Sequence, residues 1–215
     1  MVILNSKVEG VFCAGADLKE RVGMSVDEVT MTVDNLRGTF TEFENLPMAT
    51  IAVLNGVALG GGLELALCAD LRIGGDKLKA GLVETSLAII PGAGGTQRLP
   101  RLIGASKAKE LIFMASVIGG DKALQLGMIN SLELNPFEKA VKMAKKIAEK
   151  GPIAIRMAKA AINQGMEVEK GAGLAIEKSC YAQLVHSNDR IEGILLLTKG
   201  LKAFSEKRTP SYKGN

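Results

Sequence analysis

Three consecutive glycines at 60–62 interrupt the apolar stretch 55–70, NGVALGGGLELALCAD. The pattern predicts the end of a buried strand, a tight turn and then an apolar helix over about 62–69. Adjacent glycines allow a ligand or another chain segment to approach the backbone closely. The helix would direct its free N–H groups and its positive dipole end toward that ligand. Glu64 is the carboxylate in this first helical turn, and we interpret it as half of an active site.

The composition suits one folded domain of ordinary size. The chain has 215 residues, of which 47% are hydrophobic, so a sizeable core is expected and disorder is not. Aromatic residues make up only 4% and there is no Trp, which disfavours a nucleic-acid binder that stacks bases. The net charge of +4 comes from basic residues spread along the chain, which indicates a solvated surface.

The cysteines and the single histidine do not form a metal-binding pattern. Cys13, Cys68 and Cys180 lie far apart with no C-x-x-C spacing, which predicts reduced thiols in a reducing compartment. His186 lies in a polar stretch and is expected at the surface. No metal site is therefore expected. No apolar run reaches the ~18 residues of a membrane-spanning helix.

Strands and helices alternate in the first part of the chain, and helices follow. Ser25 and Glu28 form a capping-box pattern that opens a long helix ending near Glu44, before Pro47. Strands are predicted at 1–5, 48–56 and 71–75, and further helices at 104–116, 121–127, 136–150, 153–165, 167–183 and 189–208. This order predicts an α/β core with parallel strands over 1–135 and a helical region over 136–215.

Glycine-rich backbone and apolar residues coincide in three places, 13–17, 59–64 and 84–95. Each place alone is a weak signal, because glycine-rich turns most often serve packing. Neither the G-x-G-x-x-G fingerprint of dinucleotide-binding folds nor the G-x-x-x-x-G-K-[ST] phosphate loop is present, which disfavours nucleotide binding. Glu84 is flanked by apolar residues, and this pattern predicts a strand-like, buried carboxylate, which is rare in proteins.

Together the segments CAGADLKER, NGVALGGGLELALCAD and GLVETSLAIIPGAGGTQRLPRLIG resemble the enoyl-CoA hydratase/isomerase (crotonase) superfamily. NQGMEV, GLAIE, CYAQ, DRIEG, AFSEKR and YKG extend the resemblance over nearly the whole chain, and it looks closest to the methylglutaconyl-CoA hydratase branch and related mitochondrial proteins. The resemblance implies a crotonase-like spiral of ββα units. It also implies an enzyme that adds water across the α,β double bond of a short or branched acyl-CoA thioester.

The resemblance assigns the chemistry to five positions. The backbone N–H groups of Ala16 and Gly61 would form an oxyanion hole for the thioester oxygen. Glu64 and Glu84 would share one water, one accepting its proton and the other protonating the α-carbon. Two carboxylates close together in an apolar pocket are not expected both to be ionised with ordinary pKa values. Gly92, in the PGAGG turn, would help to fix the water or Glu84.

The resemblance also implies contacts with coenzyme A, which is part of the substrate, and no separate cofactor. Ala14, Asp17, Lys19 and Lys213 are the candidates, although Asp17 also suits a helix cap and an exposed lysine is by default solvated. A homotrimer or dimer of trimers and a mitochondrial location are implied in the same way. The N-terminal residues MVILNSK are expected to form a strand and not a targeting segment.

The sequence departs from the family pattern at two places. Members of the family have further residues before the position of Met1, so the first strands and a helix of the fold are expected to be lacking. Near 194–202 about seven extra residues, close to two helical turns, would lengthen the final helix without rotating its apolar face.

Three other functions remain open on this evidence. A Δ3,Δ2-enoyl-CoA isomerase typically keeps one carboxylate, at the Glu84 position, so Glu64 favours a hydratase. RNA binding is not expected, because Lys142, Lys145, Lys146 and Lys150 form an ordinary helix face. A non-catalytic assembly subunit is the third alternative, which the missing first strands make plausible.

Overall fold

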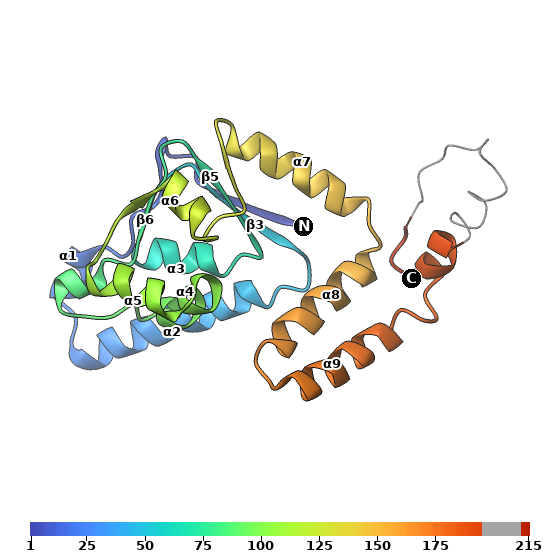
Figure 1. Ribbon diagram of the computed structural model, residues 1–215. Coiled ribbons are helices and arrows are strands. Elements are labelled where there is room, and N and C mark those ends of the chain that lie inside the picture. Colours follow the sequence, from blue (N-terminus) through green and yellow to red (C-terminus); the bar gives the residue numbers. More distant parts are fainter. Residues whose placement is uncertain (195–211) are drawn as a thin grey trace. The chain divides into compact units, whose positions relative to one another are not determined.

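The computed structural model of the protein describes residues 1–194 and 212–215 (Figure 1). The chain divides into two compact units, which we describe separately. The core unit contains Val2–Leu46 and Thr50–Val141, and the helical unit contains Met1, Pro47–Ala49 and the chain from Lys142 onward. The division into 1–135 and 136–215 stays a prediction.

Two four-stranded sheets form the centre of the core unit. The first has the order β1-β3-β5-β8, with every neighbouring pair parallel, and the second has the order β2-β4-β6-β7, in which only β7 is antiparallel. The strands are β1 Val2–Asn5, β2 Gly10–Cys13, β3 Thr50–Leu54, β4 Gly56–Leu59, β5 Leu71–Gly75, β6 Lys79–Gly81, β7 Ile118–Gly119 and β8 Ser131–Glu133. The first three strand pairs, β1-β2, β3-β4 and β5-β6, each give one strand to each sheet before a helix follows, which confirms the predicted α/β fold with ββα units.

Most helices lie close to their predicted positions, whereas η1 and α4 fall in the stretch 79–104, where no helix was predicted. In the core unit they are α1 Leu18–Val22, α2 Val26–Glu44, α3 Gly61–Leu67, the 3₁₀ helix η1 Glu84–Leu87, α4 Gly95–Ile103, α5 Ala105–Phe113 and α6 Gly120–Gln125. α7 Pro136–Ala148 leads into the helical unit, where α8 Pro152–Gly165 and α9 Lys170–Ala182 run side by side (Figure 1). None of the described helices is long and apolar enough to cross a membrane.

The predicted final helix, 189–208, is described only at its start. Residues 188–194 are helical. The rest of that helix, with nearly all of the extra residues near 194–202, lies outside the described residues.

The core lies where β3 meets α3. All five residues of β3 are buried, and Leu63 and Ala66 of α3 are fully buried in the same cluster as Leu54. A strand that is covered on both faces reads as a continuous apolar run, which is why 48–56 could be recognised in the sequence. The glycine-rich turn before α3 is therefore next to the buried core of the unit.

One local prediction is wrong. Glu84 is not on a strand: β6 ends at Gly81, and Glu84 begins η1 instead. The apolar residues that follow are exposed, Leu87 to 48% and Ile90 to 68%. The apolar run 87–90 therefore does not mark a buried strand, and Glu84 is buried by other elements.

The capping box at the start of α2 is present. The Ser25 hydroxyl accepts from the Glu28 N–H at 3.3 Å, and the Glu28 carboxylate accepts from the Ser25 N–H at 2.7 Å. We expect Ser25→Ala to lower the free energy of unfolding by about 1 kcal/mol, because an orphan N–H of the helix loses its acceptor. Urea denaturation measures this. Ser179→Ala in α9 is the control: its hydroxyl donates back to the Ala175 carbonyl within the helix and caps no helix end, so an equal loss there would contradict the capping explanation.

Candidate active site

The three glycines before and within α3 have different surroundings. Gly60 has a φ of +52°, and a Cβ placed on it would lie 3.3 Å from Glu84 Oε1. A Cβ on Gly62 would collide with the Cys13 carbonyl, whereas a Cβ on Gly61 would meet nothing within 4 Å. The turn thus needs glycine at 60 for conformation and at 62 for packing against β2, while Gly61 faces open space.

The loop after β2 lies beside this turn. A Cβ on Gly15 would lie 3.1 Å from the Leu59 carbonyl oxygen and 3.7 Å from the Gly61 nitrogen. The backbone next to Ala16 therefore meets the start of α3, as an oxyanion hole made of Ala16 and Gly61 requires. Gly61 is the first residue of α3, so its N–H has no acceptor within the helix. The assignment of the two donors stays a prediction.

Glu64 is a buried carboxylate held by main chain. Its side chain comes from the first turn of α3, and the residue is only 3% exposed. Oε1 accepts from the Ala93 N–H at 2.9 Å and from the Gly95 N–H at 2.8 Å. Burial raises the pKa of Glu64, while these two hydrogen bonds and the charges of Arg98 and Arg37 oppose the rise. Burial and the hydrogen bonds thus act on the pKa of Glu64 in opposite directions, which suits a group that gains and loses a proton.

Glu84 lies at the same end of α3. It is 9% exposed, and its Oε1 lies against Gly60, the residue that precedes the helix. The structure thus places both predicted carboxylates, Gly61 and the Gly15 backbone around the start of α3. Their catalytic roles remain predictions.

The PGAGG turn has a role that the sequence reading did not identify. Ala93 and Gly95 hold Glu64, whereas Gly92 was expected to fix the water or Glu84. The Gly92 carbonyl accepts two hydrogen bonds from Arg37 of α2. A Cβ on Gly95 would lie 3.0 Å from Glu64 Oε1, so glycine there permits the close contact. In the sequence, the glycines of this turn were the signal of a close backbone contact, and the contact is with the Glu64 carboxylate.

Of the predicted coenzyme A contacts, Ala14, Asp17 and Lys19 are exposed in the core unit near Gly15. Asp17 Oδ1 accepts from the Lys19 N–H at 2.8 Å and so caps α1. Lys213 is exposed in the helical unit, where its N–H donates to Asp189.

The thiols and the histidine match the sequence reading. The three cysteines are free, and burial raises the pKa of the Cys68 thiol to about 12. His186 is exposed. Across residues 1–194 and 212–215, no three His, Cys, Asp or Glu side chains gather in a way that could hold a metal ion.

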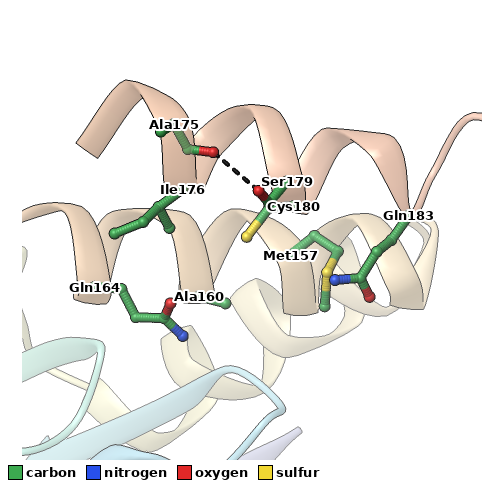
Figure 2. Close-up of a pocket in the computed structure, with 8 residues that line it drawn as sticks. All are labelled: Met157, Ala160, Gln164, Ala175, Ile176, Ser179, Cys180 and Gln183. Atoms are coloured by element: carbon green, nitrogen blue, oxygen red, sulfur yellow. Dashed lines mark hydrogen bonds between the residues drawn. The ribbon is translucent and has the colours of Figure 1, made fainter. Parts of the chain in front are cut away.

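A groove between α8 and α9 contains none of the candidate catalytic residues (Figure 2). Its volume is about 510 Å³, and Cys180 is the only titratable residue in its lining. The lining residues are Met157, Ala160, Gln164, Ala175, Ile176, Ser179, Cys180 and Gln183. It offers neither a pair of carboxylates nor a charged anchor for phosphate, so it is not our candidate for the chemistry.

Known proteins share this arrangement of sequence and fold. The sequence profile of the enoyl-CoA hydratase/isomerase family matches residues 1–215. The chain belongs to this family. The enoyl-CoA hydratase of Bacillus anthracis has a solved structure that superposes with a TM-score of 0.93 at 47% identity, covering 100% of this chain and 81% of that one. The crotonase-like fold expected from the sequence is thereby confirmed.

Two curated members of the enoyl-CoA hydratase/isomerase family are about half identical to the chain. Human mitochondrial methylglutaconyl-CoA hydratase is 53% identical over 219 residues, which cover 99% of this chain and 62% of the relative. The probable mitochondrial enoyl-CoA hydratase 2 of Arabidopsis thaliana is 52% identical over 217 residues, 100% of this chain and 70% of the relative. The chain thus spans less than two thirds of the length of the human protein.

Proposed function

We propose that the protein hydrates an enoyl-CoA, adding water across the α,β double bond of the thioester. The observation that carries the proposal is the pair of buried carboxylates, Glu64 and Glu84, at the glycine-rich start of α3. An isomerase of the family keeps a carboxylate at the Glu84 position only. The main-chain anchorage of Glu64 therefore favours the hydratase.

In the proposed mechanism the thioester oxygen accepts hydrogen bonds from the Ala16 and Gly61 N–H groups. Negative charge collects on this oxygen when the water oxygen bonds to the β-carbon, and the two donors stabilise it. The start of α3 adds its dipole to that stabilisation. The open space at Gly61 gives the thioester room to reach the backbone.

We assign the water to Glu64 and the α-carbon to Glu84. Two N–H bonds to Glu64 Oε1 favour its carboxylate form, which makes it the proton acceptor. Both hydrogen bonds recorded for this carboxylate among the described residues end on Oε1, so Oε2 is the atom we assign to the water. As the water's O–H bond breaks, Glu64 takes its proton and Glu84 gives one to the α-carbon. Exchange with solvent then deprotonates Glu64 and reprotonates Glu84.

The relatives suggest a substrate and a location. The human relative is named for methylglutaconyl-CoA and as mitochondrial, and the Arabidopsis relative as a mitochondrial enoyl-CoA hydratase. We extend both properties to this chain: a short or branched enoyl-CoA such as 3-methylglutaconyl-CoA, as in branched-chain amino acid degradation, acted on in mitochondria. Assembly into a trimer or a dimer of trimers belongs to the same proposal.

The test is direct. The purified protein is incubated with crotonyl-CoA and with 3-methylglutaconyl-CoA while the absorbance of the conjugated enoyl thioester is followed. We expect the absorbance to fall with turnover of at least one substrate, and no change with saturated butyryl-CoA. A β,γ-enoyl-CoA separates the alternatives, because an isomerase would generate the conjugated absorbance from it. If neither conjugated substrate loses absorbance, the hydratase proposal is wrong.

A further inference from the structure

The turn that holds Glu64 is itself bound by a guanidinium group. Arg37 of α2 donates from Nε and Nη2 to the Gly92 carbonyl oxygen, at 3.1 and 2.9 Å. The Gly92 carbonyl and the Ala93 N–H belong to one peptide group. That N–H is one of the two donors to Glu64 Oε1. A single peptide unit therefore connects Arg37 to Glu64.

This connection has an electrostatic consequence. Hydrogen bonds in a chain polarise one another, so a cation on the carbonyl oxygen makes the N–H at the other end of the peptide a stronger donor. A charge-assisted hydrogen bond to a carbonyl is also stronger than a neutral one, which fixes the orientation of the peptide plane. Both effects favour the ionised Glu64 in a definite position.

Packing holds the same turn from two further sides. The Ala93 side chain lies in an apolar cluster with Phe40 of α2 and with Cys68, the residue that follows α3. A Cβ on Gly92 would lie 2.9 Å from Val33 Cγ1, so glycine lets α2 approach closely enough for Arg37 to reach the carbonyl. Val33 and Arg37 are four residues apart and so share one face of α2.

A second arginine, Arg98, also donates a hydrogen bond to the turn. Arg98 of α4 donates from Nη1 to the Ala93 carbonyl at 2.9 Å and forms an ion pair with Glu44 of α2, Nη2 to Oε2, at 2.7 Å. The Arg98 side chain is only 13% exposed, so its removal would strand a partly buried Glu44. Arg37 is 54% exposed and bonds otherwise to Asp34, so it can be replaced with less damage to the fold.

We propose that Arg37 is a positioning residue for Glu64 that acts through the Gly92–Ala93 peptide group. The proposal rests on the proposed function for the meaning of its effect on turnover. Its effect on the Glu64 carboxyl can be measured whether or not the protein is a hydratase. The side-chain hydrogen bonds recorded for Arg37 within residues 1–194 and 212–215 go to the Gly92 carbonyl and to Asp34, so we assign it a positioning role and not a catalytic one.

The expected sign of the effect follows from the charges near Glu64. The charges of Arg37 from α2 and Arg98 from α4 act on this carboxyl directly. Cys68, just after α3, is coupled to Glu64, and Glu44 of α2 pairs with Arg98. Glu84 of η1 lies against Gly60 at the same end of α3. Arg37 acts to lower the pKa of Glu64 against the rise that burial causes. Removing the guanidinium therefore raises that pKa further, and the acid limb of the rate profile moves to higher pH.

The experiment compares Arg37→Met, Arg37→Lys and the control Arg101→Met. Arg101 is an exposed arginine of α4 that bonds to Gln97 on its own helix, so the control removes the same charge elsewhere in the core unit. We expect Arg37→Met to lower kcat about tenfold, because the Gly92 carbonyl loses both of its charge-assisted hydrogen bonds, with KM nearly unchanged. Arg37→Lys should recover part of the loss, and Arg101→Met should change neither parameter.

Two further measurements separate positioning from a merely structural role. In a Glu64→Gln background Arg37→Met should cause no further loss of kcat, because the group it acts on is gone. Carbon-13 NMR of labelled glutamate carboxyls, with the Glu64 signal identified by its loss in Glu64→Gln, should give a higher Glu64 pKa in Arg37→Met than in the wild type. An unchanged Glu64 pKa, or full additivity of the two substitutions, would overturn the proposal. If Arg37→Met raises the Glu64 pKa while the wild-type protein hydrates none of the substrates, the result supports the positioning role of Arg37 and rejects the proposed function.

Discussion

Glu64→Gln is expected to lower kcat for hydration by about 10²–10⁴-fold, the usual contribution of a positioned general base. Glutamine keeps an oxygen that can accept from the Ala93 and Gly95 N–H groups, so the turn around it should be preserved. It cannot accept the proton of the water. Glu84→Gln should cause a loss in the same range, because it cannot supply a proton to the α-carbon. Full activity in both variants would show that the site assignment is wrong.

Glu64→Gln should raise the stability of the fold at neutral pH, although it lowers activity. The folded-state pKa of Glu64 is raised above its ordinary 4.5, chiefly by burial. For a carboxyl with a raised pKa, the contribution to stability is fully present below the unfolded pKa and is lost as pH rises through the folded pKa. Glutamine has no such dependence. Relative to wild type, Glu64→Gln should thus gain stability as pH rises above 4.5 through the folded pKa.

Urea denaturation at acidic and at slightly alkaline pH measures this difference. Glu110→Gln is a suitable control, because the hydrogen bond from Lys107 lowers the pKa of that exposed carboxyl, and the pH dependence should have the opposite sign. Activity should be unchanged in Glu110→Gln. An inactive Glu64→Gln that is also less stable at every pH would indicate a structural role for the carboxylate instead of a catalytic one.

The features that sequence reasoning located correctly depend on local signals. The capping box Ser25–Glu28, the strand Leu71–Gly75 and the helix that carries Glu64 are each set by residues within one or two turns of one another. Glu64 itself was found because a carboxylate in an apolar helix after three glycines is chemically anomalous.

What the sequence could not reveal is the partner of each group. Ala93 and Gly95 lie 29 and 31 residues from Glu64, and Arg37 lies 55 residues from the carbonyl that it binds. Such contacts depend on how α2, α3 and the turn before α4 pack together, and no local pattern encodes them. The prediction of a strand at Glu84 is wrong for a related reason. The Glu84 side chain is buried by neighbouring elements, and the apolar residues beside it in the sequence do not indicate this.

Gly61→Ala and Gly62→Ala, one residue apart, are expected to have opposite effects. At Gly62 the new Cβ collides with the Cys13 carbonyl. Because that atom belongs to the backbone of β2, no side-chain rotation relieves the overlap, and we expect a loss of about 3 kcal/mol in the free energy of unfolding. Activity would then fall only in proportion to the folded fraction.

At Gly61 the Cβ meets nothing within 4 Å, so the fold should keep its stability, and a better helix former in the first turn adds up to about 1 kcal/mol. The methyl group would instead occupy the space through which the thioester approaches the N–H, and a misplacement of about 1 Å costs on the order of 10² in rate. Thermal denaturation and kcat/KM for crotonyl-CoA, measured on both variants, distinguish the two effects. If Gly61→Ala retained wild-type kcat/KM, the oxyanion would have to lie elsewhere, whereas a stable Gly62→Ala would contradict the close packing of α3 on β2. The opposite outcomes at adjacent positions would separate the ligand-facing glycine from the one that the fold itself requires.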